Sequence, residues 1–242
     1  MIALVTGGAN GIGAATARLL AERGATVVVA DLDRAGAEAV AAGIGGTACA
    51  VDVSDETSVA AMAALVAERF DGLDVACNVA GIAPEPKPFT DHTLAEWQRT
   101  IDVDLTGVFL CLQHELRLMV ATGRGGAIVN MASGAAVVAA PGQPQYTAAK
   151  HGVLGLTRQA AQEFAAQGIR VNAVLPGQTA TAPMQAYLDA MPDGGERMLR
   201  RLPMGRMATP EEIARATVWL CSEEASYVNG VALTVDGGLI AR

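Results

Sequence analysis

The stretch IALVTGGANGIG, residues 2–13, predicts the fold of this chain. It begins with the unbroken apolar run 2–5, which is typical of a strand buried on both faces of a parallel sheet. A glycine-rich loop follows, in which Gly7, Gly11 and Gly13 allow a tight turn, and a helical pattern comes after it. A strand, a glycine loop and a helix in this order bring backbone N–H groups to a pyrophosphate at the helix N-terminus. The spacing here is GxxxGxG, not the GxGxxG of other dinucleotide folds.

The rest of the chain repeats this alternation of apolar runs and helical patterns. Six further runs are expected to be strands, at 26–30, 47–51, 73–77, 127–131, 169–175 and 231–235. A long helical region, 94–122, is interrupted at Thr106 and Gly107, and a less regular insert spans about 178–209. Seven strands alternating with helices predict an α/β fold in one domain, 1–242: a Rossmann-type, doubly wound, seven-stranded parallel sheet with helices on both faces.

Composition excludes several classes of function. The 242 residues carry a net charge of −8, with a pI near 4.9, which argues against nucleic acid or an anionic membrane as the main partner. The four cysteines and three histidines show no metal-ligand spacing, so we expect no metal site and reduced cysteines in a cytoplasmic protein. No apolar run reaches the ~18 residues of a membrane span, and we expect no signal peptide.

Motif residues follow the carboxyl ends of the predicted strands, where a doubly wound sheet places its ligand crevice. They are Gly7, Asp31, Asp52, Asn78, Ser133 and Pro176. Asp31 lies 18 residues past Gly13, about where an acidic side chain reaches the ribose hydroxyls of NAD. Because a carboxylate would repel the 2′-phosphate of NADP, we expect NAD, with NADP disfavoured. The alternative role for Asp31 is a helix N-cap, and Ser54 is expected to cap the helix after the third strand.

Tyr146 and Lys150 lie four residues apart in a segment whose apolar residues recur at helical spacing. On a helix the two side chains share a face, so an ammonium lies beside a phenol. A nearby cation favours the phenolate, which makes such a pair in a cleft a candidate general acid/base. The same spacing is also common on solvated helix faces.

Together these motifs closely resemble those of the short-chain dehydrogenase/reductase family over essentially the full chain. The matching segments are 6–13, Asp52-Val53, Asn78-Val-Ala-Gly81, Ser133, Tyr146-x-x-x-Lys150, Pro176-Gly177, Thr181 and Asp236-Gly-Gly238. The resemblance implies that Tyr146 is the general acid/base, that Lys150 favours its phenolate and holds the nicotinamide ribose, and that Ser133 holds the substrate oxygen.

The resemblance also implies a set of cofactor contacts. They are Gly7, Asn10, Gly11, Ile12, Gly13, Asp31, Leu32, Asp52, Val53, Asn78, Ala80, Gly81, Val103, Tyr146, Lys150, Pro176, Gly177, Thr179 and Thr181. Among these, Asp52 is expected at the adenine, and the backbone after Pro176 at the carboxamide.

Asp104 departs from the family, which usually has Asn at this place in the middle of the long helix. In the family, that Asn supports a helix kink whose backbone carbonyl binds a water next to the lysine. We count Asp104 as a fourth catalytic residue and favour a substitution that retains activity. The other reading is that its carboxylate pairs with Lys150 and weakens the effect of Lys150 on Tyr146.

The insert offers the only sequence clue to the substrate. It holds five methionines, Met184, Met191, Met198, Met204 and Met207, which suit a lid over an apolar alcohol or ketone but equally suit packing of the insert on the body. Its four arginines, Arg197, Arg200, Arg201 and Arg206, suit an acidic substrate or a solvated face.

Three functions fit this sequence. The favoured one is an NAD-dependent oxidoreductase that interconverts a secondary alcohol and a ketone of a small-molecule metabolite. The alternatives are a reductase of 3-oxoacyl groups on a carrier, which Asp31 disfavours, and a non-catalytic NAD-binding homologue. The family resemblance further implies a homotetramer or homodimer.

Overall fold

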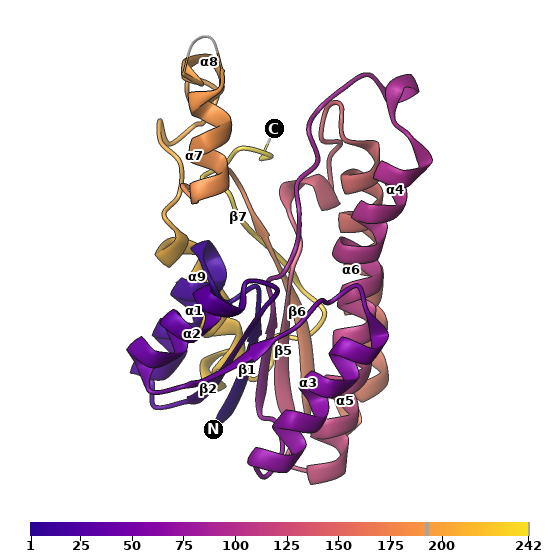
Figure 1. The fold of residues 1–242 in the computed structure, drawn as a ribbon, viewed down its shortest axis with the longest axis vertical. Helices are drawn as coiled ribbons and strands as arrows, with labels where there is room; N and C mark the ends of the chain where they lie inside the picture. Colours follow the sequence, from indigo (N-terminus) through magenta and orange to yellow (C-terminus); the bar gives the residue numbers. More distant parts are fainter. Residues whose placement is uncertain (192–193, 242) are drawn as a thin grey trace.

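The seven predicted strands form and lie side by side in one parallel sheet (Figure 1). In chain order they are β1 Ile2–Thr6, β2 Thr26–Asp31, β3 Thr47–Ala50, β4 Val75–Asn78, β5 Gly126–Met131, β6 Ile169–Pro176 and β7 Ala232–Val235. This is a computed structural model, and it describes residues 1–191 and 194–241. The order across the sheet is β3-β2-β1-β4-β5-β6-β7, so the winding reverses between β1 and β4. A crevice for ligands forms outside the carboxyl ends of the strands at such a reversal.

Helices cover both faces of the sheet. They are α1 Gly11–Glu22, α2 Arg34–Ile44, α3 Glu56–Arg69, α4 Leu94–Ile101, α5 Gly107–Thr122, α6 Pro144–Phe164, α7 Ala182–Asp189, α8 Glu196–Leu199 and α9 Pro210–Cys221. Shorter turns are η1 Phe89–Asp91, the π-helical η2 Asp102–Thr106, η3 Gly134–Ala136, η4 Ala165–Gln167 and η5 Glu223–Ala225. No helix in the described residues is long and apolar enough to cross a membrane.

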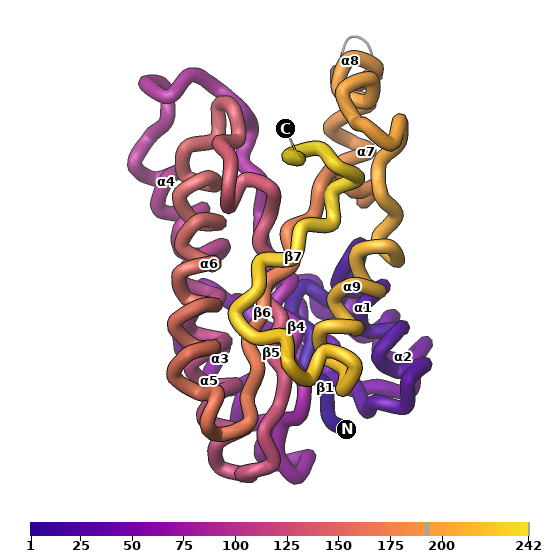
Figure 2. Tube along the Cα trace, turned by 180° about the vertical axis from the view of Figure 1, so that it is seen from behind, coloured from indigo at the N-terminus to yellow at the C-terminus, as the bar shows by residue number. Residues whose placement is uncertain are grey.

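Two hydrophobic cores lie on opposite faces of the sheet. One packs under α1, α2 and α9, and the other under α3, α5 and α6. Successive strand residues point to opposite faces, so Val28 belongs to one core and Val29 to the other, both with no exposed surface. This double burial explains why the strands carry unbroken apolar runs such as 27–30. Figure 2 shows the same layers from behind, with the C-terminal segment rising beyond β7 between the two helical sides.

The helix caps correct one sequence prediction. Pro210 occupies the first turn of α9, behind a capping box formed by Thr209 and Glu212. Ser54 does not cap α3, so that prediction was wrong. Its hydroxyl donates to Asp52 Oδ1 at 2.6 Å, while the side chain of Asp55 caps the helix by accepting from the Thr57 N–H at 3.1 Å.

The interruption of the long helix is the π-helical turn η2, which links α4 to α5. Gly107 follows it because a Cβ there would lie 2.9 Å from Val53 Cγ2, in the loop after β3. Asp104 sits in the middle of the turn with no exposed surface. The insert forms α7 and α8, which rise above the carboxyl ends of the strands across from α4 (Figure 1).

Candidate active site

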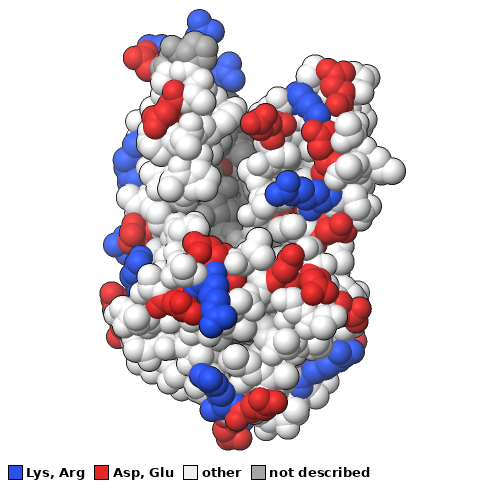
Figure 3. All heavy atoms as spheres, viewed as in Figure 1, with Lys and Arg blue, Asp and Glu red and all other residues white. Residues whose placement is uncertain are grey.

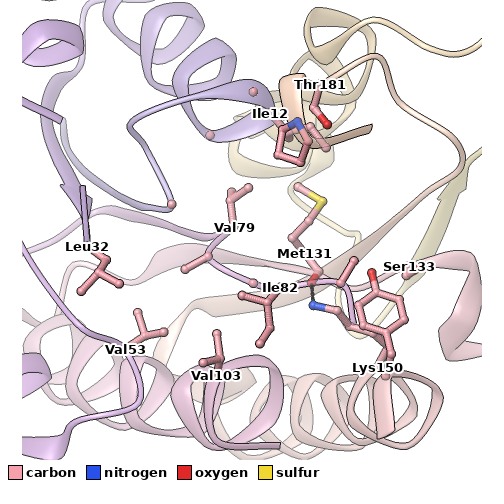
Figure 4. A pocket seen from close by; sticks show the side chains of 18 of the residues that line it. Ile12, Leu32, Val53, Val79, Ile82, Val103, Met131, Ser133, Lys150 and Thr181 are labelled. Carbon is pink, nitrogen blue, oxygen red and sulfur yellow. Dashed lines mark hydrogen bonds between the residues drawn. The ribbon is translucent and has the colours of Figure 1, made fainter. Parts of the chain in front are cut away.

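A cavity of about 970 Å³ opens at the carboxyl ends of the central strands. The space-filling view shows the surface hollowed between two raised parts, which are the insert with α7 and the side that carries α4 (Figure 3). Figure 4 shows that the cavity is elongated, with Leu32 and Val53 toward one end and Ser133 and Lys150 at the other. Its shape therefore suits an extended ligand such as a dinucleotide.

The site residues predicted from the sequence line the cavity, with the exceptions of Asn78 and Asp104. Every other predicted cofactor contact lines it, and so does Ser133. Asn78 is buried, and its Nδ2 group donates to Glu115 Oε2 at 2.9 Å and to Asn130 Oδ1 at 3.0 Å. This side chain therefore serves the interior of the protein, and the contact of Asn78 with the cofactor stays a prediction.

Sequence reasoning missed other residues that line the cavity. They are Val51, Ser54, Val79, Ile82, Ala83, Ala95, Gln98, Arg99, Asp102, Met131, Ala132 and Pro183. Many of these flank a predicted contact, so proximity in the sequence could have found them. The residues from α4 and the turn after it gave no signal, because polar residues on a helix usually mean solvent exposure.

Asp31 lies at one end of the cavity with its carboxylate held by backbone groups. Its Oδ2 atom accepts from the Ala9 N–H at 2.9 Å, and its Oδ1 atom accepts from the Asp33 N–H at 2.9 Å. Asp33, not Asp31, caps α2 by accepting from the Gly36 N–H at 3.1 Å. The alternative role of Asp31 as a helix N-cap was therefore wrong, and its charge stays at the cavity edge.

The glycine loop brings the start of α1 into the cavity wall. A Cβ on Gly13 would lie 1.9 Å from the Gly7 carbonyl oxygen, so only glycine allows this close approach. The N-cap residue, Asn10, makes no side-chain hydrogen bond to the first turn. The first N–H groups of a helix have no partner within the helix, so the first turn of α1 can still bind an anion such as a pyrophosphate.

Tyr146, Lys150 and Ser133 meet at the other end of the cavity. Tyr146 and Lys150 come from the first two turns of α6, and Ser133 follows β5. The Lys150 Nζ atom lies 5.5 Å from the centre of the Tyr146 ring and donates to the Met131 carbonyl oxygen at 3.3 Å. The expected cation beside the phenol is therefore present, and it is 4% exposed.

Asp104 lies just behind this wall of the cavity and forms a buried ion pair with Lys150. The Lys150 Nζ and Asp104 Oδ1 atoms are 3.6 Å apart, and Oδ1 also accepts from the Ile82 N–H at 2.9 Å. Gly81 lies against both charges, since a Cβ there would be 2.7 Å from Oδ1 and 3.3 Å from Nζ. The other oxygen, Oδ2, has no hydrogen-bond partner among the described residues.

The two charges stabilise each other against the cost of burial. Burial raises the pKa of Asp104 above its usual value, although the Lys150 charge and the Ile82 N–H oppose this rise. Burial alone would lower the pKa of Lys150, but the charges of Asp104 and Tyr146 outweigh it and leave that pKa raised. The Lys150 ammonium therefore interacts electrostatically with both a phenol and a carboxylate.

The insert contributes apolar surface to the cavity, and none of its arginines lines it. Of its five methionines, all in the described residues, Met184 lines the cavity. None of its four arginines does so. Arg200 pairs with Glu196 at 3.0 Å, and Arg206 pairs with Glu212 at 2.7 Å on the surface. These contacts favour the solvated-face reading of the arginines over an acidic-substrate site.

Comparisons with known proteins agree with this geometry. Residues 7–240 match the family described as enoyl-(acyl carrier protein) reductase, a group of short-chain dehydrogenases/reductases. The chain is 50% identical over 245 residues to the cis-4-hydroxycyclohexanecarboxylate dehydrogenase of Sinomonas cyclohexanicum, covering 99% of this chain and 96% of that protein. It is 37% identical over 246 residues to the cyclohexanol dehydrogenase of Acinetobacter sp. strain SE19, covering 100% and 95%.

Among solved structures, levodione reductase is 36% identical and superposes with a TM-score of 0.95, covering 99% of this chain and 97% of that one. These similarities span nearly the whole chain, including the glycine loop, the Ser133, Tyr146 and Lys150 site, and the insert. The chain therefore belongs to the short-chain dehydrogenase/reductase family of oxidoreductases.

Proposed function

We propose that this protein is an NAD-dependent dehydrogenase that interconverts a secondary alcohol and the corresponding ketone of a small molecule. One observation carries the proposal. A single elongated cavity holds Asp31 at the end suited to a ribose, and it holds Ser133, Tyr146 and Lys150 at the end suited to hydride transfer. Three separate parts of the chain supply these groups: the end of β2, the loop after β5 and the start of α6.

The residues of the cavity fit NAD better than NADP. The open N–H groups at the start of α1 suit the pyrophosphate, and Asp31 suits the ribose hydroxyls next to it. The Asp31 carboxylate would repel a 2′-phosphate, and its two backbone hydrogen bonds hold it in place. Arg99 is the one arginine or lysine other than Lys150 that lines the cavity within the described residues.

The chemistry then divides among the three residues at the reactive end. NAD, when bound, supplies the hydride acceptor. In alcohol oxidation, the Ser133 hydroxyl holds the substrate oxygen and the Tyr146 phenolate takes the hydroxyl proton. Lys150 would hold the nicotinamide ribose of bound NAD, and its charge would stabilise the phenolate. In ketone reduction, the Tyr146 hydroxyl returns that proton to the oxygen.

We further propose that the substrate carries its alcohol on a cyclohexane-type ring. Two relatives are named for ring alcohols of this kind, and the similarity to them covers nearly the whole chain. The cavity wall includes Ile82, Met131 and Met184, which suit a compact apolar ring. A carrier-linked 3-oxoacyl substrate and a non-catalytic role are the alternatives. The cytoplasmic location and the tetramer or dimer stay predictions.

The test mixes the protein with NAD⁺ and a panel of secondary alcohols and follows NADH absorbance. The panel contains cyclohexanol, cis-4-hydroxycyclohexanecarboxylate, an acyclic secondary alcohol and, in reverse with NADH, a 3-oxoacyl thioester. We expect turnover of the ring alcohols, and Tyr146→Phe should retain NADH binding while turnover falls by about two orders of magnitude or more. Equal turnover by the Phe variant, or no turnover of any alcohol or ketone, would contradict the proposal.

A further inference from the structure

The buried pair of Asp104 and Lys150 places a negative charge close to the candidate general base. Asp104 Oδ1 is 3.6 Å from Lys150 Nζ, which is in turn 5.5 Å from the centre of the Tyr146 ring. The carboxylate therefore lies within about 9 Å of that ring, with no exposed surface of its own. Charges this deep are screened far less than charges on the surface.

Few other charges act on this cluster. The groups that act on Lys150 are Asp104, from the turn η2, and Tyr146, from its own helix. Lys150 is the charged group that acts on Asp104. The neighbouring β5 and the loop after β4 contribute only backbone groups, the Met131 carbonyl oxygen and the Ile82 N–H. Within the described residues, these three side chains therefore form one electrostatic unit.

We propose that Asp104 is a positioning residue that restrains Lys150 and raises the pH at which Tyr146 becomes a competent base. A lone ammonium would favour the phenolate with its full charge. Here the carboxylate offsets that charge and draws Nζ toward η2. A neutral side chain at this position would leave the ammonium effect intact. This inference rests on the proposed role of Tyr146 as general base.

The orphaned Oδ2 atom supports a role in charge rather than in packing. A residue that served only to hold the Ile82 N–H would need a single acceptor, which an asparagine oxygen supplies equally well. Asp104 instead buries a second oxygen without any hydrogen-bond partner among the described residues, at a cost to stability. The buried charge is thus the property that distinguishes aspartate from asparagine here.

The direct test is Asp104→Asn, which keeps the shape and the acceptor for Ile82 but removes the charge. A unit charge about 9 Å away at an effective dielectric constant of about 20 is worth about one pH unit. We therefore expect the acidic limb of the kcat/KM profile for alcohol oxidation to move about one unit lower. Below the limb, the variant should be about tenfold faster than the wild type. Glu68→Gln, which removes an exposed charge on α3, should leave the limb in place.

A second readout separates this inference from the dehydrogenase proposal. The ultraviolet absorbance of tyrosinate, taken as the difference from a Tyr146→Phe background, follows the phenol without any substrate. Its midpoint should also move lower in Asp104→Asn. If no alcohol is oxidised but this shift appears, the proposed function fails and the electrostatic role stands. An unmoved or higher midpoint overturns the inference even in an active enzyme.

Folding of the variant is checked first by thermal unfolding. If Asp104→Asn does not fold, Asp104→Ser removes the charge with a smaller side chain. The wild-type protein supplies a third measurement, since the NMR shift of the Ile82 amide reports the charge on the carboxylate that it contacts. We expect that carboxylate to be ionised wherever Tyr146 titrates. A protonated Asp104 in that range would overturn the inference without any variant.

Discussion

Glu115 offers the sharpest test of the electrostatics beneath the site, because its charge is buried in the core. It lies on α5 and is 1% exposed, and its Oε2 atom accepts from Asn78 Nδ2 at 2.9 Å. Its Oε1 atom has no hydrogen-bond partner among the described residues. Burial raises the pKa of Glu115 to about 7, against the weaker opposing effect of Asn78. We predict that Glu115→Gln stabilises the protein above neutral pH.

A chain of hydrogen bonds from Thr157 through Asn130 and Asn78 determines which oxygen of Glu115 must accept a hydrogen bond. The Thr157 hydroxyl donates to the Val153 carbonyl oxygen at 2.8 Å, so its oxygen accepts from Asn130 Nδ2 at 3.0 Å. Asn130 Oδ1 is then left to accept from Asn78 Nδ2, which donates its other hydrogen to Glu115. A proton can therefore sit on Oε1 without breaking any bond of this chain. The substitution Glu115→Gln would keep the acceptor and place an amide group where Oε1 now lies.

The sign of the effect follows from the raised pKa. The ordinary pKa of a glutamate is 4.5. The free energy of unfolding that depends on a protonated Glu115 is therefore fully present below pH about 4.5, and it is lost as the pH rises to about 7. In this pH range Glu115 ionises in the unfolded chain, whereas burial disfavours its ionised form in the folded chain. The loss amounts to about 1 kcal/mol near pH 5.5 and about 3 kcal/mol at pH 8. Glu115→Gln should recover these amounts.

The assay is thermal or urea unfolding of both proteins across this pH range. A gain of about 3 kcal/mol in a chain of this size corresponds to a rise in Tm of about 6–12 °C. Glu68→Gln, an exposed glutamate on the neighbouring α3, should change Tm little at any pH. A gain in Glu115→Gln that is the same at pH 5.5 and pH 8, or a loss at pH 8, would refute the reasoning.

Two further predictions concern the nucleotide end of the cavity. Gly13→Ala should abolish NADH binding measured by fluorescence, because its Cβ would lie 1.9 Å from the Gly7 carbonyl oxygen. The control is Gly43→Ala in α2, where a Cβ would meet nothing within 4 Å. That variant should bind NADH normally and gain about 0.5–1 kcal/mol of stability. Normal binding by Gly13→Ala would show that the loop can open. Asp31→Asn should raise the ratio of NADP⁺ to NAD⁺ in kcat/KM by about tenfold, since it removes one charge and keeps an acceptor for backbone N–H groups. An unchanged ratio would mean that another feature selects the cofactor.

The sequence by itself determined the sheet and the two halves of the cavity. Strand β2 is apolar and buried over 27–30 because both faces of the sheet are covered, so its local pattern already encodes its burial. Gly7, Asp31 and Ser133 could be placed together because the carboxyl ends of parallel strands share one edge of the sheet. The pair of Tyr146 and Lys150 needed only the spacing of a helix, which is a local property.

Tertiary structure alone decided which polar groups face the cavity and which face the core. Asn78 and Asp31 both follow a strand, yet Asn78 turns to Glu115 and Asp31 stays at the cavity. The contact of Asp104 with Lys150 depends on how the π-helical turn packs against α6, so the sequence offered this pairing only as the less favoured reading. Periodicity describes a side chain relative to its own element. The charge that a side chain meets depends on another element, and only the packed fold brings the two together.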